Sequence, residues 1–446
     1  MGTNFGAHYV GPGNGSYTYD VAAALAVDRQ GAAFVTGRSL GNTGVYDYAI
    51  VKYEPNGNQA WVARYDGPAH ANDHATAVAV DGLGQIYVTG ESTGIFFDYA
   101  TVKYDTNGNQ LWVARYNGPG NNDDSAVAVV VDSAGNVYIT GNSVGVVGTG
   151  TDIATIKYNP AGHQLWVARY DGPAHYYDSA AALAVDAAGC VYVTGASCGD
   201  GFHNDYLTIK YAVNGTQVWT ARYHGTGNNS DFPEAIALDA SNNVYVTGQS
   251  WGAGTLTDYA TLKYDADGNR QWVARYNGPG NSYDVASPLA LDGKGGIFVT
   301  GSSTSAGTDY DFATLKYDAA GQLLWVARFD APGHTNDSPR DMVVDGAGNI
   351  FVTGISSGFN SGATCDYLTL KYALETRLDS CRRLSGGAFE FRLSGEPGRS
   401  YQIQVSTNLS NWTSSCVATN SSGTVMCQDA AATNSARRFY RALKQP

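Results

Sequence analysis

Three histidines of this 446-residue chain occupy one position of a recurring sequence, within "GPAH" or "APGH": His70, His175 and His334. Three imidazoles on one centre would form a zinc site, because three-histidine sets hold catalytic zinc. Other copies of the same position carry asparagine, at Asn121, Asn228 and Asn281. A histidine–asparagine exchange that caps a turn explains this pattern better, so we expect no metal and no cofactor.

Two charged residues interrupt alanine-rich runs such as "SAAALAVD", at Glu234 and Arg340. A carboxylate and a guanidinium at the mouth of a channel could bind a polar ligand, or act as acid and base. A salt-linked pair is the simpler interpretation. No GxSxG, HExxH, P-loop or dinucleotide-binding fingerprint is present, so we assign no catalytic residue.

Aromatic rings and imidazoles gather in segments that differ from copy to copy, such as "ASCGDGFHN" at 196–204 and "QSWGAGTLT" at 249–257. A variable aromatic rim on a uniform scaffold is typical of a binding face for a sugar or another protein. The candidate ligand-binding residues on this face are Tyr19, His70, His175, Tyr177, His203, Glu234, Trp251, His334 and Arg340.

These candidates are spaced by an internal repeat of 51 to 54 residues. The motif "TG.S" marks its copies, at Gly37, Gly90, Gly141, Gly195, Gly248, Gly301 and Gly354. A "DYATVKY"-like run follows each motif, and "WVARY"-like runs follow six of them. Repeats of this length are typical of solenoids and propellers.

Each copy contains four strand-like runs, as in residues 124–170: "DSAVAVVVD", "NVYITGNS", "DIATIKY" and "QLWVARY". Glycine-containing tight turns such as "SAGN" separate the first two and the last two. The first run is rich in alanine and the fourth in tryptophan and tyrosine. Small inner and bulky outer strands fit wedge-shaped propeller blades, so we predict an all-β chain of four-stranded blades.

Polar residues also recur in every copy, including an aspartate eight residues before the "AVD" aspartate, as in Asp73 and Asp81. A catalytic site needs one asymmetric group of residues, not seven equal ones. We therefore interpret the repeated polar residues as structural. The aspartates should accept hydrogen bonds from loop amides and from the repeated lysine or arginine.

The repeat resembles the seven-bladed β-propeller repeat (SBBP) and, more distantly, NHL-type blades, which share "AVD..GNVYVT". This resemblance covers residues 4–372 and implies a seven-bladed propeller, but it implies no activity. The last copy lacks a "WVARY" run, whereas "TNFGAHYVGPGN" at 3–14 is a diverged copy of it. We expect "NFGAHYV" to supply the missing outer strand and close the ring.

A second small domain is expected after the propeller, with boundaries at 1–374 and 375–446. Runs such as "GGAFEFRL" and "RSYQIQVS" indicate a small, fibronectin-like β-sandwich. "GEPGRSYQIQVSTNLSNW" and "RFYRAL" resemble a C-terminal module of secreted bacterial proteins. Cys416 and Cys427 flank a strand–turn–strand pattern, which leaves a disulfide and two buried thiols equally open.

The net charge of −13 argues against nucleic acid or an anionic membrane as partner, and no apolar run could span a membrane. "MGTNFG" lacks the basic and apolar regions of a signal peptide, so a signal would lie outside this sequence. We expect an extracellular or cell-surface bacterial protein. Its role would be non-catalytic binding or scaffolding, with a carbohydrate or protein ligand. The alternative is a polysaccharide hydrolase or lyase with its site at the channel mouth.

Overall fold

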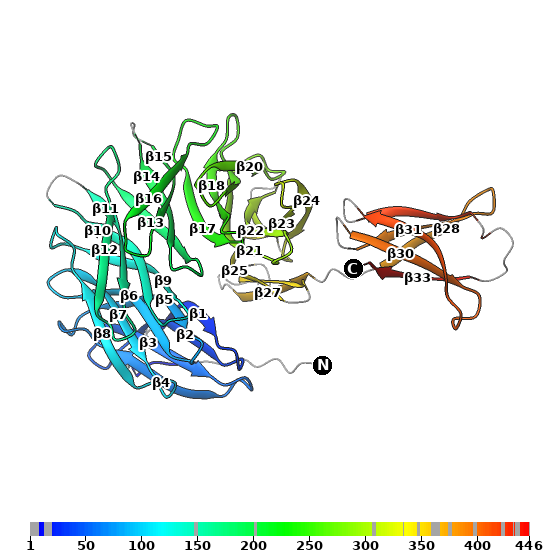
Figure 1. Cartoon of the computed structure of the whole chain (residues 1–446). Coiled ribbons are helices and arrows are strands. Elements are labelled where there is room, and N and C mark those ends of the chain that lie inside the picture. The colour runs from blue at the N-terminus through cyan, green and yellow to red at the C-terminus, as the bar shows by residue number, and fades with distance from the viewer. Residues whose placement is uncertain are drawn as a thin grey trace. The chain divides into compact units, whose positions relative to one another are not determined.

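The structure is a computed structural model (Figure 1). It describes residues 9–12, 20–146, 150–199, 203–305, 309–332, 334–345, 348–357, 366–372, 377–395, 399–420, 424–430, 432 and 438–445. By its contacts the chain divides into two compact units, Met1–Gln271 and Trp272–Pro446. The domain boundary predicted from the sequence lies at residue 374 and does not coincide with the division between these two units. It remains a prediction.

Five four-stranded antiparallel sheets begin in the first unit, each with its strands in chain order. The last strand of the fifth sheet, β20, crosses into the second unit. The strands are β1 (Val21–Val27), β2 (Ala33–Leu40), β3 (Tyr46–Tyr53) and β4 (Gln59–Tyr65); β5 (Asp73–Val80), β6 (Ile86–Thr93), β7 (Phe97–Tyr104) and β8 (Gln110–Tyr116); β9 (Asp124–Val131), β10 (Val137–Val144), β11 (Thr151–Tyr158) and β12 (Gln164–Tyr170); β13 (Asp178–Val185), β14 (Val191–Cys198), β15 (Asn204–Tyr211) and β16 (Gln217–Tyr223); and β17 (Phe232–Leu238), β18 (Val244–Trp251), β19 (Thr257–Tyr264) and β20 (Arg270–Tyr276).

The second unit continues the pattern with one four-stranded and one three-stranded sheet, followed by two further three-stranded sheets. The first two are β21 (Asp284–Leu291), β22 (Ile297–Thr304), β23 (Tyr310–Tyr317) and β24 (Leu323–Phe329), then β25 (Asp337–Val344), β26 (Ile350–Ser356) and β27 (Asp366–Tyr372). The other two contain β28 (Arg377–Arg383), β29 (Phe389–Ser394) and β32 (Thr424–Asp429), and β30 (Arg399–Ser406), β31 (Thr413–Asn420) and β33 (Phe439–Lys444). The all-β prediction of repeated four-stranded antiparallel sheets is confirmed.

The turn between the first two strands of a repeat is fixed by its "AVD" aspartate. In the second sheet, Asp81 Oδ1 accepts hydrogen bonds from the amides of Leu83 and Gln85, each at 2.9 Å. Gly84 follows with a φ of 77°, a conformation that glycine adopts at low cost. Tyr87 donates its hydroxyl hydrogen to Asp81 Oδ2 at 3.0 Å, which ties the turn to the second strand.

The glycine of "TG.S" is required by close approach of the first strand. A Cβ atom on Gly90 would lie 2.1 Å from the carbonyl oxygen of His74. The strand pair shifts register at this place, between Ala75 and Ala77. The bulge brings the two backbones together, and only a residue without a side chain fits there.

Neighbouring sheets of the first unit pack through apolar side chains and through hydroxyl groups that reach across. One cluster joins Phe34 and Ile50 of the first sheet to Val88 and Val102 of the second. Tyr48, which is 1% exposed, donates its hydroxyl hydrogen to the carbonyl oxygen of Ala100 at 3.1 Å. Each sheet therefore completes the core of the next one.

The repeated aspartates accept loop amides as expected, but the repeated lysines act differently. Asp73 accepts the amides of Gly67 and Thr93, at 2.6 and 3.0 Å. Lys103, by contrast, lies over the ring of Tyr87, 5.0 Å from its centroid. It also donates to the carbonyl oxygen of Pro160 in the next repeat, at 3.2 Å. Lys103 therefore extends toward the following sheet and does not pair with Asp73. In the sixth sheet the repeated lysine does pair with a repeated aspartate, since Lys316 Nζ lies 4.0 Å from Asp292 Oδ2.

The two last sheets share one apolar core, formed by Phe391 and Leu393 of β29 together with Tyr401 and Ile403 of β30. Cys416 lies in β31 and Cys427 in β32, which belong to different sheets, and both are free thiols. Burial raises the pKa of the Cys427 thiol to about 11. The two-thiol alternative thus holds here.

The N-terminal segment lies mostly outside the described residues, so pairing of "NFGAHYV" with the last repeat is untested. Two contacts just after it are described. Arg64 donates to the Tyr9 hydroxyl at 3.2 Å, as Arg115 does to Tyr65 in the next repeat. Gly11 donates its amide to Asp20 at 2.7 Å. Residues 9–11 therefore make the contacts of the end of a fourth strand.

Candidate functional site

The most variable positions of the repeat lie side by side on its first two strands. They form one cross-strand pair next to the buried first-strand aspartate and the glycine of "TG.S". In the first unit the pairs are Val21/Arg38, His74/Glu91, Ser125/Asn142, Ser179/Ala196 and Phe232/Gln249. In the second unit they are Val285/Ser302 and Ser338/Ile355. The aspartate and glycine that recur in every copy thus position a pair of side chains that differs from copy to copy, at one end of each sheet.

A hydrogen-bonded histidine and glutamate occupy this position in the second sheet. His74 Nδ1 of β5 lies 2.8 Å from Glu91 Oε1 of β6. The two side chains are 23% and 24% exposed. They are therefore fixed by each other yet remain accessible to a ligand.

Two aromatic rings flank the imidazole of His74. The centroid of the Tyr46 ring lies 6.3 Å from it, and that of Phe97 lies 5.9 Å from it. The guanidinium of Arg38 lies over Tyr46, 5.3 Å from the ring centroid. The group combines ring faces with a carboxylate and cationic donors, which suits a polar ligand that carries some apolar surface.

The environment of Glu91 favours its ionised form. Burial raises the pKa of this carboxyl, but hydrogen bonds from His74 and Ser125 outweigh that effect. The charges of His74 and Arg38 act in the same direction. The net result is a pKa below the ordinary value, so Glu91 is a hydrogen-bond acceptor at neutral pH rather than an acid.

A hollow of about 480 Å³ opens at the same end of the third, fourth and fifth sheets. Glu234, the third residue of β17, is the only ionisable side chain among the described residues that line it. Desolvation by its surroundings raises the pKa of the Glu234 carboxyl. The other lining residues are Val127, Ser179, Ala180, Ala181, Ala196, Phe232, Pro233 and Gln249.

The three histidines of the recurring turn each bind an aspartate of their own turn. His70 Nδ1 lies 2.7 Å from Asp66, and His175 and His334 repeat this contact at 2.7 and 2.5 Å. All three have a positive φ, of 49°, 51° and 49°. None of them belongs to a group of metal-ligating side chains within the described part of the chain.

Asparagine makes the equivalent contact in other repeats. Asn117 donates to Asn121 at 3.1 Å, and Asn277 donates to Asn281 at 2.6 Å. Asn121 and Asn281 also have a positive φ, of 45° and 49°. The histidine–asparagine exchange therefore preserves a bond that closes the turn.

The remaining candidates are spread over several elements. Tyr177 is 70% exposed between β12 and β13, and His203 is half-buried just before β15. Trp251 ends β18, where its amide donates to Asp231 Oδ1 at 2.9 Å. Arg340 lies exposed on β25 of the second unit, and Tyr19 falls outside the described residues.

Glu91 and Arg38 were not among the candidates predicted from the sequence. Both follow the glycine of "TG.S" directly, where the other copies carry Asn142, Ala196, Gln249, Ser302 and Ile355. An alignment of the repeats with one another would have revealed this position. It varies from copy to copy, whereas the glycine before it and the serine after it are the same in every copy.

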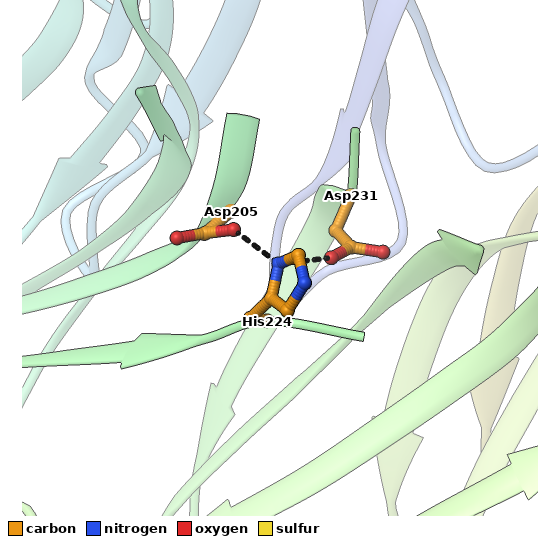
Figure 2. Close-up of side chains that lie close together, drawn as sticks. All are labelled: Asp205, His224 and Asp231. Atoms are coloured by element: carbon orange, nitrogen blue, oxygen red, sulfur yellow. Dashed lines mark hydrogen bonds and ion pairs between the residues drawn. The ribbon is translucent and has the colours of Figure 1, made fainter. Parts of the chain in front are cut away.

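Carboxylates also cluster where the fourth strands β4, β12, β16 and β24 lead into the next repeat. Four groups of three side chains place one ligand atom of each within 4.8 Å of the others. They are Asp47/Asp66/Asp73, Asp152/Asp171/Asp178, Asp205/His224/Asp231 and Asp311/Asp330/Asp337. In the group with a histidine, His224 lies between the two carboxylates (Figure 2).

Two segments of the chain, residues 111–145 and 218–254, match the beta-propeller repeat family SBBP. Each match runs from the fourth strand of one sheet to the second strand of the next. These two segments are thus similar to β-propeller repeats. The resemblance based on "TG.S" and "WVARY" is confirmed for the copies that contain them.

A curated relative is the uncharacterized WD repeat-containing protein L264 of Acanthamoeba polyphaga mimivirus, which is 22% identical over 470 residues. The match covers 75% of this chain and 33% of that protein. The chain thus spans about a third of the length of this relative.

Similar solved structures include the β-propeller domain of the Trilobed protease from Pyrococcus furiosus, at 8% identity and a TM-score of 0.46. That match covers 80% of this chain and 95% of that one. The acylaminoacyl peptidase of Pyrococcus horikoshii is 7% identical with a TM-score of 0.45, covering 85% and 58%. A protein of unknown function from Dyadobacter fermentans is 11% identical with a TM-score of 0.39, covering 67% and 94%. These values say nothing of what this chain binds.

No helix in the described part of the chain has the length and apolar character needed to cross a membrane.

Proposed function

We propose that the repeated sheets are the blades of a seven-bladed propeller. Six sheets have four strands, and the sheet of β25, β26 and β27 has three. Its missing outer strand would come from "NFGAHYV". The contacts of Tyr9 and Gly11 support this assignment, because they are those of residues that follow a fourth strand. The sheets of residues 377–445 would form the C-terminal β-sandwich.

We further propose that the chain is a non-catalytic binding protein for a carbohydrate. The observation that carries this proposal is the set of non-repeated cross-strand pairs at one end of the sheets. The binding face would include the hollow beside Glu234 and the ring-flanked pair of His74 and Glu91. Amide, carboxylate and aromatic groups together suit a sugar, whose hydroxyls need hydrogen bonds and whose ring faces stack on aromatics.

A polysaccharide hydrolase is less well supported. Such enzymes use two carboxyl groups about 5–10 Å apart across the scissile bond. Glu234 has the raised pKa of an acid, but the described residues lining its hollow include no second carboxyl group. The described residues of the hollow therefore suit ligand binding better than hydrolysis, which would need a second carboxyl group.

The resemblance to secreted bacterial modules motivates a proposal for location: outside the cell or on its surface. The absence of repeated basic residues on the variable pairs agrees with a neutral ligand rather than nucleic acid. A signal peptide in the full-length gene product would test this, and retention in the cytoplasm would contradict it.

A glycan array probed with the full chain tests the carbohydrate proposal. We expect a defined set of glycans to bind, and Glu234→Gln and Gln249→Ala to weaken binding at least about tenfold, since each removes a hydrogen bond to the ligand. Leu83→Ala is the control, because Leu83 is 79% exposed in a hairpin turn away from the pairs. If no glycan binds, or if only a protein partner is captured, the carbohydrate proposal fails. Release of reducing ends from a bound glycan would favour the hydrolase.

A further inference from the structure

Three aspartates from two neighbouring repeats converge where β12 leads into β13. Asp152 lies in β11, Asp171 directly follows β12, and Asp178 begins β13. One ligand oxygen of each lies within 4.8 Å of those of the other two. Asp152 and Asp178 are 4% and 1% exposed, whereas Asp171 is exposed. Three negative charges therefore meet at a place that is open to solvent on one side.

Protein groups bind one oxygen of each carboxylate. Arg169 donates to Asp152 Oδ2 at 2.6 Å, and the amide of Gly172 donates to Asp178 Oδ2 at 2.6 Å. His175 Nδ1 lies 2.7 Å from Asp171 Oδ2. Asp152 Oδ1, by contrast, is buried and has no hydrogen-bond partner. A buried carboxylate oxygen without a partner is costly, and a bound cation would satisfy it.

The next repeat shows where this oxygen points. Its equivalent residues are Asp205, His224 and Asp231 (Figure 2). His224 Nδ1 lies 2.9 Å from Asp205 Oδ1 and 3.9 Å from Asp231 Oδ2. The Oδ1 atom of the third-strand aspartate thus faces the residue that follows the fourth strand. By this equivalence, Asp152 Oδ1 would face Asp171, whose carboxylate stands where the next repeat has the imidazole of His224.

We propose that Asp152, Asp171 and Asp178 bind a divalent cation, calcium. An all-oxygen ligand set suits a hard cation, and calcium–oxygen distances of about 2.3–2.6 Å allow two ligand oxygens to lie up to about 5 Å apart. Water molecules on the exposed side of Asp171 complete the coordination. This site was not predicted from the sequence, in which the histidines were the metal-ligand candidates and the repeated aspartates were expected to accept hydrogen bonds from loop amides.

Two other groups consist of three aspartates at the equivalent positions, but the proposal is confined to Asp152, Asp171 and Asp178. Here the third-strand aspartate keeps a buried oxygen without a partner, and the adjacent repeat shows its direction. A calcium ion at this position joins β11 of one sheet to β13 of the next. It would therefore strengthen the joint between two sheets at the end that carries the variable pairs.

Calorimetric titration of the chelator-treated full chain with calcium chloride tests the proposal. We expect binding with a dissociation constant on the order of 10⁻⁵ to 10⁻³ M, the range of sensor and extracellular sites. Asp171→Asn should bind one ion fewer per chain than the wild type. Asp171→His reproduces the arrangement of His224 and should lose the same ion. Asp267→Asn, which removes an exposed carboxylate of the β19–β20 turn, should bind as many ions as the wild type.

Thermal melts followed by circular dichroism accompany the titration. The wild-type melting temperature should rise with calcium, because the ion binds only the folded state, and Asp171→His should respond less. A folded Asp171→His protein also keeps the comparison valid if Asp171→Asn does not fold. The proposal is overturned if the wild type binds no calcium, as a proton shared by the carboxylates would predict. It is equally overturned if both variants at Asp171 bind as many ions as the wild type.

Discussion

At the scale of single residues, the arginine of "WVARY" connects neighbouring sheets. Arg115 donates from Nη1 to Ser92 Oγ at 2.6 Å and from Nη2 to Asp98 Oδ2 at 2.8 Å, both in its own sheet. It also donates to the Tyr65 hydroxyl of the preceding sheet at 3.2 Å. Arg64, Arg169, Arg222 and Arg328 form the same type of network. The guanidinium fits because its planar donors reach several acceptors at once.

Replacement of Arg115 by alanine should lower the free energy of unfolding by about 3 kcal/mol, because it leaves the largely buried Asp98 carboxylate without its partner. Chemical denaturation of the two proteins measures the difference. Arg115→Lys is the control: it keeps the charge but not the planar set of donors, and we expect an intermediate loss. A loss below about 0.5 kcal/mol for the alanine variant would contradict the proposed role.

Glu91 should make stability depend on acidity. Its pKa is held below the usual 4.5 in the folded chain, so the unfolded chain binds this proton more readily. The stabilisation is complete above about pH 4.5 and is lost as the pH falls through the lower, folded pKa. The difference in unfolding free energy between the wild type and Glu91→Gln should therefore shrink from about pH 6 to about pH 3. A difference that is constant with pH would refute this.

At the scale of elements, tryptophan rings of the fourth strands cover the hairpin turns of the following sheets. Trp112 Nε1 donates to the carbonyl oxygen of Pro160 at 3.1 Å. Gly162 of the same turn has a φ of 83°, and a Cβ atom there would lie 2.8 Å from the Trp112 ring. Gly108 under Trp61 and Gly215 under Trp166 repeat this arrangement. Glycine is required at this position of the turn for two reasons. The backbone has a positive φ, and the tryptophan ring leaves no room for a side chain.

Gly162→Ala should therefore destabilise the chain more than Gly44→Ala. Gly44 has the same φ of 83° but no atom within 4 Å of an added Cβ, so it isolates the backbone cost. Overpacking against the ring should add about 1–3 kcal/mol at Gly162. Thermal or urea unfolding of both variants gives the difference. Equal losses would show that the ring moves aside freely.

The strands could be predicted from sequence because their alternation and their turn residues are local patterns. The packing of Trp112 over Gly162 could not, because the two residues are far apart in the chain and belong to different copies. Glu91 was missed for a related reason: its importance comes from His74 and Arg38, which the fold brings beside it. The buried aspartates were recognised as repeated, but the unpartnered oxygen of Asp152 is visible only in three dimensions.

At the scale of the whole molecule, the first residues of the chain are proposed to complete its last repeat. Deletion of residues 1–10 should therefore lower the melting temperature by roughly 10 °C, because it removes both a strand and the Tyr9 hydroxyl that Arg64 binds. The single variant Tyr9→Phe is the control, since it removes the hydroxyl alone and should cost far less. Differential scanning calorimetry measures both. An unchanged melt after the deletion would refute the proposed closure.

The arginine–tyrosine contact has a consequence for how such a chain can change in length over generations. Several copies offer a tyrosine hydroxyl to the arginine of the copy after them, as Tyr65 does to Arg115 and Tyr116 does to Arg169. The fourth strand β24 ends instead in Phe329, which has no hydroxyl to offer. Duplication or loss of one complete copy between junctions of the tyrosine type, by unequal recombination, would therefore leave the remaining contacts of this type chemically intact.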